Sequence, residues 1–388
     1  MIEVSAKLVG GPIYLPGESI GCCITFTNPP VPSDTRSRSN KDVLETLAWA
    51  SAQIHCLRST SDKINISTPE AVVPEEVCIS SSETSFAPCR GDRGKIVLST
   101  KPKILFCDLR LSPGESRTYL YTEVLPNQSP PSYRGQLVKY SYKITVGTQR
   151  VNCPIKQLRV PLRVLVISGT PEIVTSEESV DLSPSNPFLE DSSEKSGSAP
   201  QQHAAIELMQ NITARRSPNV YNITHTNGKV ARFCLFKQAY KLGEDIVGTF
   251  DFVGAAVRCV QLTVTLQCEE VIADAFRAKA KQDRAVISYS NCHEVCLSVR
   301  QCVLNLPIPL HVTPAFDTDV VSLRWRLHFE FVTTDSDSDL FSVEKDSTTW
   351  QGPQSLSIET MIWDLPIQIY PTVLTPDPHS QVKYSIDI

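Results

Sequence analysis

Apolar and polar side chains alternate in two similar stretches that lie far apart in the chain. The first stretch follows Gly17-Glu18 and places a small or apolar residue at every second position: Ile20, Cys22, Ile24 and Phe26. The second follows Gly243-Glu244 with the same spacing: Ile246, Gly248, Phe250 and Phe252. A tyrosine stands three residues before each glycine. A repeat of this length, with a period of two residues, predicts β-strands in two lobes built to one plan.

The clearest alternation lies at 138–146 and 323–331, where apolar side chains occupy every second position. Strict alternation places one face of a strand against the core and the other in water. A slip of one residue would bury the charged side chains, so the register is well specified. We interpret the intervening basic residues as solvated, with an acidic lipid or partner as the alternative contact. These residues are Lys139, Lys143, Arg324 and Arg326.

Each lobe ends in an apolar segment with an internal proline, at 160–164 and 365–369. Proline lacks the N–H that a central strand needs, so Pro161 and Pro366 predict a sheet edge or a bulge. Short strands and turn residues dominate the chain, and no run of long amphipathic helices interrupts them. The sequence therefore predicts an all-β fold of two antiparallel β-sandwiches, over residues 1–168 and 220–372.

The segments outside these lobes have a different composition. Residues 169–219 form an acidic, Ser/Pro-rich linker that we expect to be disordered, with one short helix within 204–216. Residues 373–388 are expected to form a flexible tail. Three polar insertions interrupt the predicted strands, and long loops of this kind often carry function. They lie at 29–43, 59–94 and 333–350.

Composition and charge narrow the functional classes. A net charge of −5 gives no basic stripe of the kind that nucleic acid requires. No apolar run reaches the ~20 residues of a membrane-spanning helix, and the first residues lack the features of a secretion signal. We therefore expect a cytoplasmic protein whose 13 cysteines are thiols. In that compartment the glycosylation sequons are chance matches. They begin at Asn65, Asn127, Asn211 and Asn222.

The sequence contains no motif for covalent catalysis or phosphate binding, so we predict a protein that is not an enzyme and has no cofactor. One cluster resembles a zinc site, namely Cys292-His293-x-x-Cys296 with Cys302 beyond it. The same segment also reads as a strand, which would direct these side chains to different faces. No second close pair completes a set of four ligands. We therefore predict no metal site.

Three short motifs match known recognition signals. Arg90-Gly91-Asp92 spells an integrin-binding tripeptide, which a cytoplasmic protein would not use. Asn186, Pro187 and Phe188, in the linker, form a weak candidate for docking to an EH domain, because Asn-Pro favours a turn that presents the Phe. Pro130-Pro-Ser-Tyr133 matches a ubiquitin-ligase docking signal. It falls between two predicted strands, so we interpret it as a structural loop.

The Tyr-x-x-Gly-Glu-x-Ile opening of both lobes resembles that of the arrestin fold. Longer stretches are similar to the Rgp subunit of the Ric–Rgp complex. They are 47–56 (LAWASAQIHC), 102–111 (PKILFCDLRL), 130–135 (PPSYRG) and 322–331 (SLRWRLHFEF). This resemblance covers both lobes. It excludes the linker, with its Asn-Pro-Phe tripeptide, and the three polar insertions.

The resemblance implies a role in membrane traffic. The Rgp subunit pairs with a large β-propeller subunit, Ric, at the Golgi membrane. The pair acts as a guanine-nucleotide exchange factor for a Rab GTPase of the Rab-six class, preferring its GDP-bound or nucleotide-free form. It supports retrograde transport from endosomes to the trans-Golgi network. We expect this chain to be the non-catalytic scaffold of such a heterodimer, in the cytosol and peripherally on the Golgi.

An alternative is an arrestin-type cargo adaptor that links receptor tails to coat proteins or ubiquitin ligases. Under the scaffold hypothesis, the exposed sheet edges near the Pro161 and Pro366 strands are candidates to accept a strand from a partner. The sequence alone identifies no residue that contacts the GTPase or the partner subunit.

Overall fold

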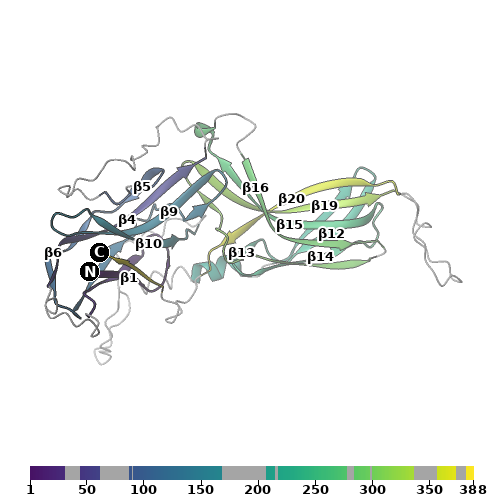
Figure 1. Ribbon diagram of the computed structural model, residues 1–388. Helices are drawn as coiled ribbons and strands as arrows, with labels where there is room; N and C mark the ends of the chain where they lie inside the picture. The colour runs from purple at the N-terminus through teal and green to yellow at the C-terminus, as the bar shows by residue number, and fades with distance from the viewer. Residues whose placement is uncertain are drawn as a thin grey trace, which may run out of the picture. The chain divides into compact units, whose positions relative to one another are not determined.

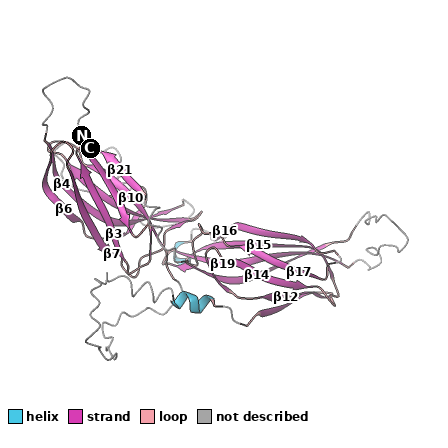
Figure 2. Cartoon of the chain, turned by 90° about the horizontal axis from the view of Figure 1, so that it is seen from below, coloured by secondary structure: helices cyan, strands magenta, loops and turns pink. Residues whose placement is uncertain are grey.

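The computed structural model describes residues 1–30, 44–61, 87–89, 91–167, 207–214, 217–277, 284–297, 299–335, 356–372 and 382–388. The chain divides into two compact units. The first lobe comprises Met1–Val166 with Asp274–Gln282 and Val373–Ile388, and the second comprises Ile167–Ala273 with Asp283–Thr372. Strands make up nearly all of the regular structure (Figures 1 and 2), which confirms the predicted all-β fold.

The first lobe contains two sheets. One has the strand order β21-β1-β3-β7, and the other has the order β2-β10-β9-β4-β5, with β6 also beside β4 and β8 beside β9. Phe26 of the first sheet packs against Phe106 of the second, with ring centroids 5.0 Å apart, so the sheets face each other across a core. The strands are β1 (Glu3–Val9), β2 (Ile13–Tyr14), β3 (Ser19–Thr27), β4 (Glu45–Thr60), β5 (Lys95–Ser99), β6 (Lys103–Leu111), β7 (Ser116–Val124), β8 (Tyr133–Arg134), β9 (Val138–Gln149), β10 (Lys156–Val164) and β21 (Lys383–Asp387).

The second lobe follows the same plan. Its sheets have the orders β11-β12-β14-β17 and β13-β20-β19-β15-β16, with β18 beside β19. Phe233 of one sheet packs against Phe329 of the other at 5.2 Å. The strands are β11 (Asn219–His225), β12 (Gly228–Leu235), β13 (Ala239–Lys241), β14 (Asp245–Asp251), β15 (Arg258–Ile272), β16 (Arg284–Val295), β17 (Gln301–Pro307), β18 (Phe316–Asp317), β19 (Val321–Thr334) and β20 (Glu359–Tyr370).

The repeated Tyr-x-x-Gly-Glu motif forms the same turn in both lobes. Gly17 and Gly243 have φ values of 85° and 83°, in the left-handed region that glycine adopts without steric cost. The glutamate after each glycine closes the turn with its side chain. Glu18 Oε2 accepts from Leu15 N at 2.9 Å, and Glu244 Oε2 accepts from Lys241 N at 2.8 Å. The motif therefore encodes the turn that leads into β3 and β14.

The end of the predicted flexible tail is a strand. β21 pairs antiparallel with β1, and the backbones of Ile2 and Ile388 exchange hydrogen bonds of 3.0 and 2.8 Å. Both ends of the chain accordingly lie near β1 (Figure 1). In the second lobe, β11 occupies the equivalent position beside β12. A strand forms at Lys383–Asp387 because the edge of β1 offers unpaired backbone groups, which outweigh the weak local pattern of five residues.

The connecting segments are described only in part. A helix spans 207–213, within the region where the sequence predicts one (Figure 2). No described helix is long and apolar enough to cross a membrane. Most of the linker and most of the three polar insertions lie outside the described residues, so the expectation of disorder there stays a prediction.

Candidate partner-binding site

A buried polar cluster lies on the outer side of the β10-β9-β4 sheet. His55 of β4 stands opposite Lys143 of β9 and is 0% exposed. Asp92, from the segment that precedes β5, accepts from Lys143 Nζ at 2.8 Å and from Arg159 Nη1 at 3.2 Å. Burial lowers the pKa of His55 to about 4, and the positive charge of Lys143 adds to this effect. His55 is therefore neutral at pH 7.

This cluster is arranged for structure rather than for nucleophilic chemistry. The Cys89 thiol lies close to the same groups, and burial raises its pKa to about 11. A reactive cysteine needs a lowered pKa and a base that can take its proton, and neither condition is met here. The ion pairs of Asp92 instead hold its loop against the sheet. Asp92 is thus half-buried against the sheet, whereas Arg90 of the Arg-Gly-Asp tripeptide lies outside the described residues.

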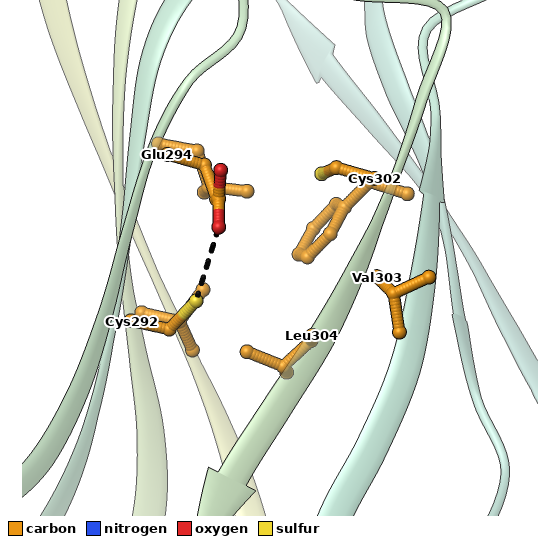
Figure 3. A pocket seen from close by; sticks show the side chains of 8 residues that line it. Cys292, Glu294, Cys302, Val303 and Leu304 are labelled. Atoms are coloured by element: carbon orange, nitrogen blue, oxygen red, sulfur yellow. Dashed lines mark hydrogen bonds between the residues drawn. The ribbon is translucent and has the colours of Figure 1, made fainter.

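The side chains of the candidate zinc ligands His293 and Cys292 lie on opposite faces of β16. His293 Nδ1 lies 3.0 Å from Thr263 Oγ1 on one face, and Cys292 lines a narrow pocket on the other. Figure 3 shows Cys292 and Glu294 of β16 across this pocket from Cys302 of β17. Cys292 Sγ lies 3.9 Å from Glu294 Oε1. Across the described ranges, no three His, Cys, Asp or Glu side chains are grouped so that they could hold a metal ion.

The thiols near this pocket are protonated at neutral pH. Hydrogen bonding with Cys259, together with burial, raises the pKa of Cys296 to about 12. Hydrogen bonding with Cys296, together with burial, also raises the pKa of Cys302. Cys296 and Cys302 therefore form hydrogen bonds as thiols within the second lobe.

Two of the four residues in the predicted basic stripes, Arg326 and Lys143, are paired with acidic neighbours. Arg326 Nη1 lies 3.2 Å from Asp364 Oδ2, and His328 Nδ1 lies 2.6 Å from Asp364 Oδ1. In the first lobe, Lys143 is paired with Asp92 as described above. Arg324 is exposed, but its cross-strand neighbour is Glu269. Around Lys143 in the first lobe and Arg326 in the second, the surface therefore carries charges of both signs, and contact with an anionic lipid stays a prediction.

The Pro-Pro-x-Tyr sequence belongs to the fold of the first lobe. Tyr133 is buried in β8, and Tyr142 Oη donates to Pro130 O at 2.7 Å. Ser132 also pairs with Val164 through its backbone N–H and its side-chain oxygen, at 2.8 and 2.9 Å. The motif is thus a structural loop, as the sequence predicts. The other docking candidate, Asn186-Pro187-Phe188, lies outside the described residues.

Pro161 and Pro366 lie in strands that are only partly paired on one side. Each proline lacks the N–H group that an added strand would need on that side. β2 pairs with β10 only at Arg163 and Val164, and β13 pairs with β20 only at 368–370. Arg163 N donates to Pro12 O at 2.7 Å, so odd-numbered residues of β10 direct their N–H groups to that side. Pro161 removes a donor there. Gln368 N bonds Gln238 O at 2.9 Å, so the same holds for Pro366 in β20.

Comparison with known proteins gives the family. Residues 90–176 and 168–334 match the family model described as Rgp1. The chain belongs to the Rgp1 family. It is 44% identical over 380 residues to human "RAB6A-GEF complex partner protein 2", covering 96% of this chain and 95% of that protein. It is also 44% identical over 376 residues to the bovine protein of the same name, covering 95% and 93%. The resemblance found in the sequence is confirmed.

In this Rgp1 family member, strand β16 forms a sheet edge that the sequence pattern did not predict. β16 has a neighbouring strand on one side, and no described strand pairs with its other side. The signal was present in the sequence, because residues 285–292 (AVISYSNC) are rich in strand formers and carry no charge. The cysteine and histidine at the end of this run, Cys292 and His293, instead have a spacing typical of metal ligands.

Proposed function

We propose that this chain is a subunit of a guanine-nucleotide exchange factor complex that acts on a Rab GTPase of the Rab-six class. The observation that carries the proposal is the 44% identity to "RAB6A-GEF complex partner protein 2" over nearly the full length of both chains. Similarity at this level spans both lobes rather than a single shared module. The role of the relative, as its name states it, is therefore the best-supported role for this chain.

Exchange requires no covalent chemistry from either subunit. An exchange factor binds the nucleotide-free GTPase more tightly than the nucleotide-bound form, and by linkage it weakens nucleotide binding by the same factor. It does so by moving the loops that hold the phosphates and Mg²⁺. A chain that binds both the GTPase and a large β-propeller subunit contributes by positioning them. We infer that this chain is the non-catalytic scaffold of the heterodimer.

The proposal includes a place of action. The complex would be recruited from the cytosol to the Golgi membrane as a peripheral protein. There it would support retrograde transport from endosomes to the trans-Golgi network, starting from the GDP-bound GTPase. A tagged chain should colocalise with Golgi markers in cells, and its depletion should delay delivery of an endosomal cargo to the trans-Golgi network. A uniform cytosolic signal with normal cargo delivery would contradict this part of the proposal.

The decisive experiment is a reconstitution. The chain is co-expressed with the β-propeller subunit, and the purified complex is added to a Rab-six-class GTPase loaded with a fluorescent GDP. We expect a stoichiometric complex that accelerates GDP release, whereas the chain alone and a Rab of another class serve as controls.

A pull-down in EDTA, which removes Mg²⁺ and empties GTPases, tests the same proposal from the binding side. Retention of the Rab mainly in EDTA would support it. Retention of receptor tails, coat proteins or ubiquitin ligases without the Rab or the propeller subunit would favour the cargo-adaptor alternative.

A further inference from the structure

Exposed cations gather at one end of the outer sheet face in the first lobe. Arg134 of β8 stands directly opposite Lys139 of β9, and both side chains are exposed. Ser59 of β4 stands on the other side of Lys139, and its Oγ donates to the backbone oxygen of Arg93 at 2.9 Å. Arg93 is exposed as well. We call Arg134, Lys139 and Arg93 the cationic row, because they lie on adjacent segments that cross this end of the sheet.

The charges of the cationic row are not neutralised within the described part of the chain. The ion pairs found there in the first lobe all involve other residues. Like charges that stand directly opposite each other on a sheet are destabilising. The juxtaposition of Arg134 and Lys139 therefore costs stability, and an anionic partner bound at this point would relieve the repulsion.

The second lobe serves as an internal comparison, because it is built on the same plan. Its strands β18 and β19 correspond to β8 and β9, and there Asp317 stands opposite Ser322. Farther along β19, Arg326 is paired with Asp364. The repeated fold thus does not require two cations at this position. The like-charge pair is a property of the first lobe alone, which favours a role in binding over a role in folding.

The same sheet face already holds one carboxylate. Asp92 Oδ1 accepts from Lys143 Nζ at 2.8 Å and from Arg159 Nη1 at 3.2 Å. These cations belong to β9 and β10, which lie side by side with β4 (Figure 1). The contact of Asp92 shows the kind of anion that this face accommodates, namely a carboxylate held between two basic side chains from neighbouring strands.

The dimensions of the cationic row indicate the size of its occupant. Neighbouring strands lie about 4.8 Å apart, so the row spans about 15 Å from β8 to the segment that holds Arg93. An extended chain rises about 3.3 Å per residue, so about five residues would cover this distance. Recognition of an anionic membrane typically uses clusters of about four to eight basic residues, more than the row contains. A short acidic segment is therefore the better match.

We propose that the cationic row binds a short, extended, acidic segment of another protein, which carries its carboxylates within about five residues. These carboxylates pair with Arg134, Lys139 and Arg93 in the way that Asp92 pairs with its two cations. The inference goes beyond the proposed function and does not depend on it. The competing occupants are an anionic membrane and the acidic residues of this chain's own segment 62–86, which follows β4 and lies outside the described residues.

An NMR titration of the full chain, labelled with ¹⁵N-lysine and ¹⁵N-arginine, tests the proposal. The acidic probe is the peptide Gly-Ser-Glu-Gly-Glu-Gly-Glu-Ser, and the control probe has glutamine in place of each glutamate. Exposed ion pairs are weak, so we expect a dissociation constant in the millimolar range that rises with salt. The amide signals of Arg134, Lys139 and Arg93 should shift with the acidic probe only. Equal shifts with both probes, or none with the acidic probe, would overturn the proposal.

Variants that carry the residues of the second lobe test which side chains bind. Arg134→Asp and Lys139→Ser both remove the like-charge pair, so the melting temperature should stay the same or rise. The dissociation constant of the acidic probe should nevertheless rise about fivefold or more. Lys156→Ser is the matched control, because Lys156 is exposed at the other end of β9, opposite Thr148. If Lys156→Ser weakens binding as much as Lys139→Ser, net charge rather than the cationic row is responsible, and the proposal is wrong.

Two further measurements address the competing occupants. Vesicles that contain phosphatidylserine are added to the wild type and to Lys139→Ser. Vesicle binding that is lost in the variant, together with no response to the acidic probe, would assign the row to a membrane. A second variant replaces four glutamates of segment 62–86 by glutamine, namely Glu70, Glu75, Glu76 and Glu83. If the acidic probe binds only to that variant, the row belongs to the chain's own segment. Either result would overturn the proposal.

Discussion

The buried His55 should make the stability of the first lobe depend on pH. Its pKa is about 4 in the folded protein, against about 6.5 for an unfolded histidine. Below pH 6.5 the unfolded state binds more protons, so the free energy of unfolding rises with pH. The contribution of neutral His55 is complete above pH 6.5 and is lost as the pH falls toward 4. Between pH 7 and pH 5, linkage gives a loss of about 2 kcal/mol.

His55→Leu isolates this effect because leucine cannot titrate. Lys143, Asp92 and Arg159 remain in both proteins, so their titration cancels in the comparison. The free energy of unfolding of the variant should change by about 2 kcal/mol less than that of the wild type between pH 7 and pH 5. The matched control is Thr145→Val, which removes a buried hydroxyl on the same sheet without removing a titrating group.

Urea unfolding read by amide exchange in peptides from β4 would follow the first lobe separately from the second. The control variant should keep the wild-type pH dependence. If the free energy of unfolding depends on pH in the same way for the wild type and His55→Leu, the reasoning is refuted. Such a result would mean that the fold does not hold His55 neutral.

Two further predictions concern the turns and the thiols. Gly94→Ala should destabilise the first lobe more than Gly114→Ala, because both glycines have positive φ but only a Cβ at 94 would meet the backbone oxygen of Arg58, at 2.5 Å. Backbone strain alone costs about 1–2 kcal/mol in either variant. Equal melting temperatures for the two variants would therefore contradict an additional steric clash. Cys107 is exposed, whereas burial raises the pKa of Cys56 to about 12, so iodoacetamide at pH 8 should label Cys107 first. Equal labelling of the folded protein by mass spectrometry would refute this order.

The sequence was sufficient to predict the two-lobed plan because its signals are local. The alternation at 138–146 and 323–331 follows from burial of one face of β9 and β19. The Gly-Glu turns depend on a positive φ and one side-chain hydrogen bond, which are also determined by neighbouring residues. Patterns of this kind can be read without knowledge of the strand on either side.

The features that the sequence did not predict depend on distant partners. β21 forms because β1 lies beside it, although more than 370 residues separate them along the chain. His55 lies in a stretch of β4 that is buried on both faces, where the period of two disappears because the Asp92 segment covers the outer face. The uncharged run at 285–292 indicates a strand, but the position of β16 at the edge of its sheet depends on which distant strands pair with it. The candidate site was therefore less predictable than the fold.

The pairing of β1 with β21 has a consequence for biosynthesis. The ribosome makes β1 more than 370 residues before β21, so the strand that covers its edge is available only after residues 383–387 have been synthesised. During the interval, the first lobe carries an open edge that chaperones or other nascent chains can engage. A transcript with a premature stop codon in the second lobe would leave that edge open permanently. The edge of β1 is therefore covered only after translation has passed through the whole of the second lobe.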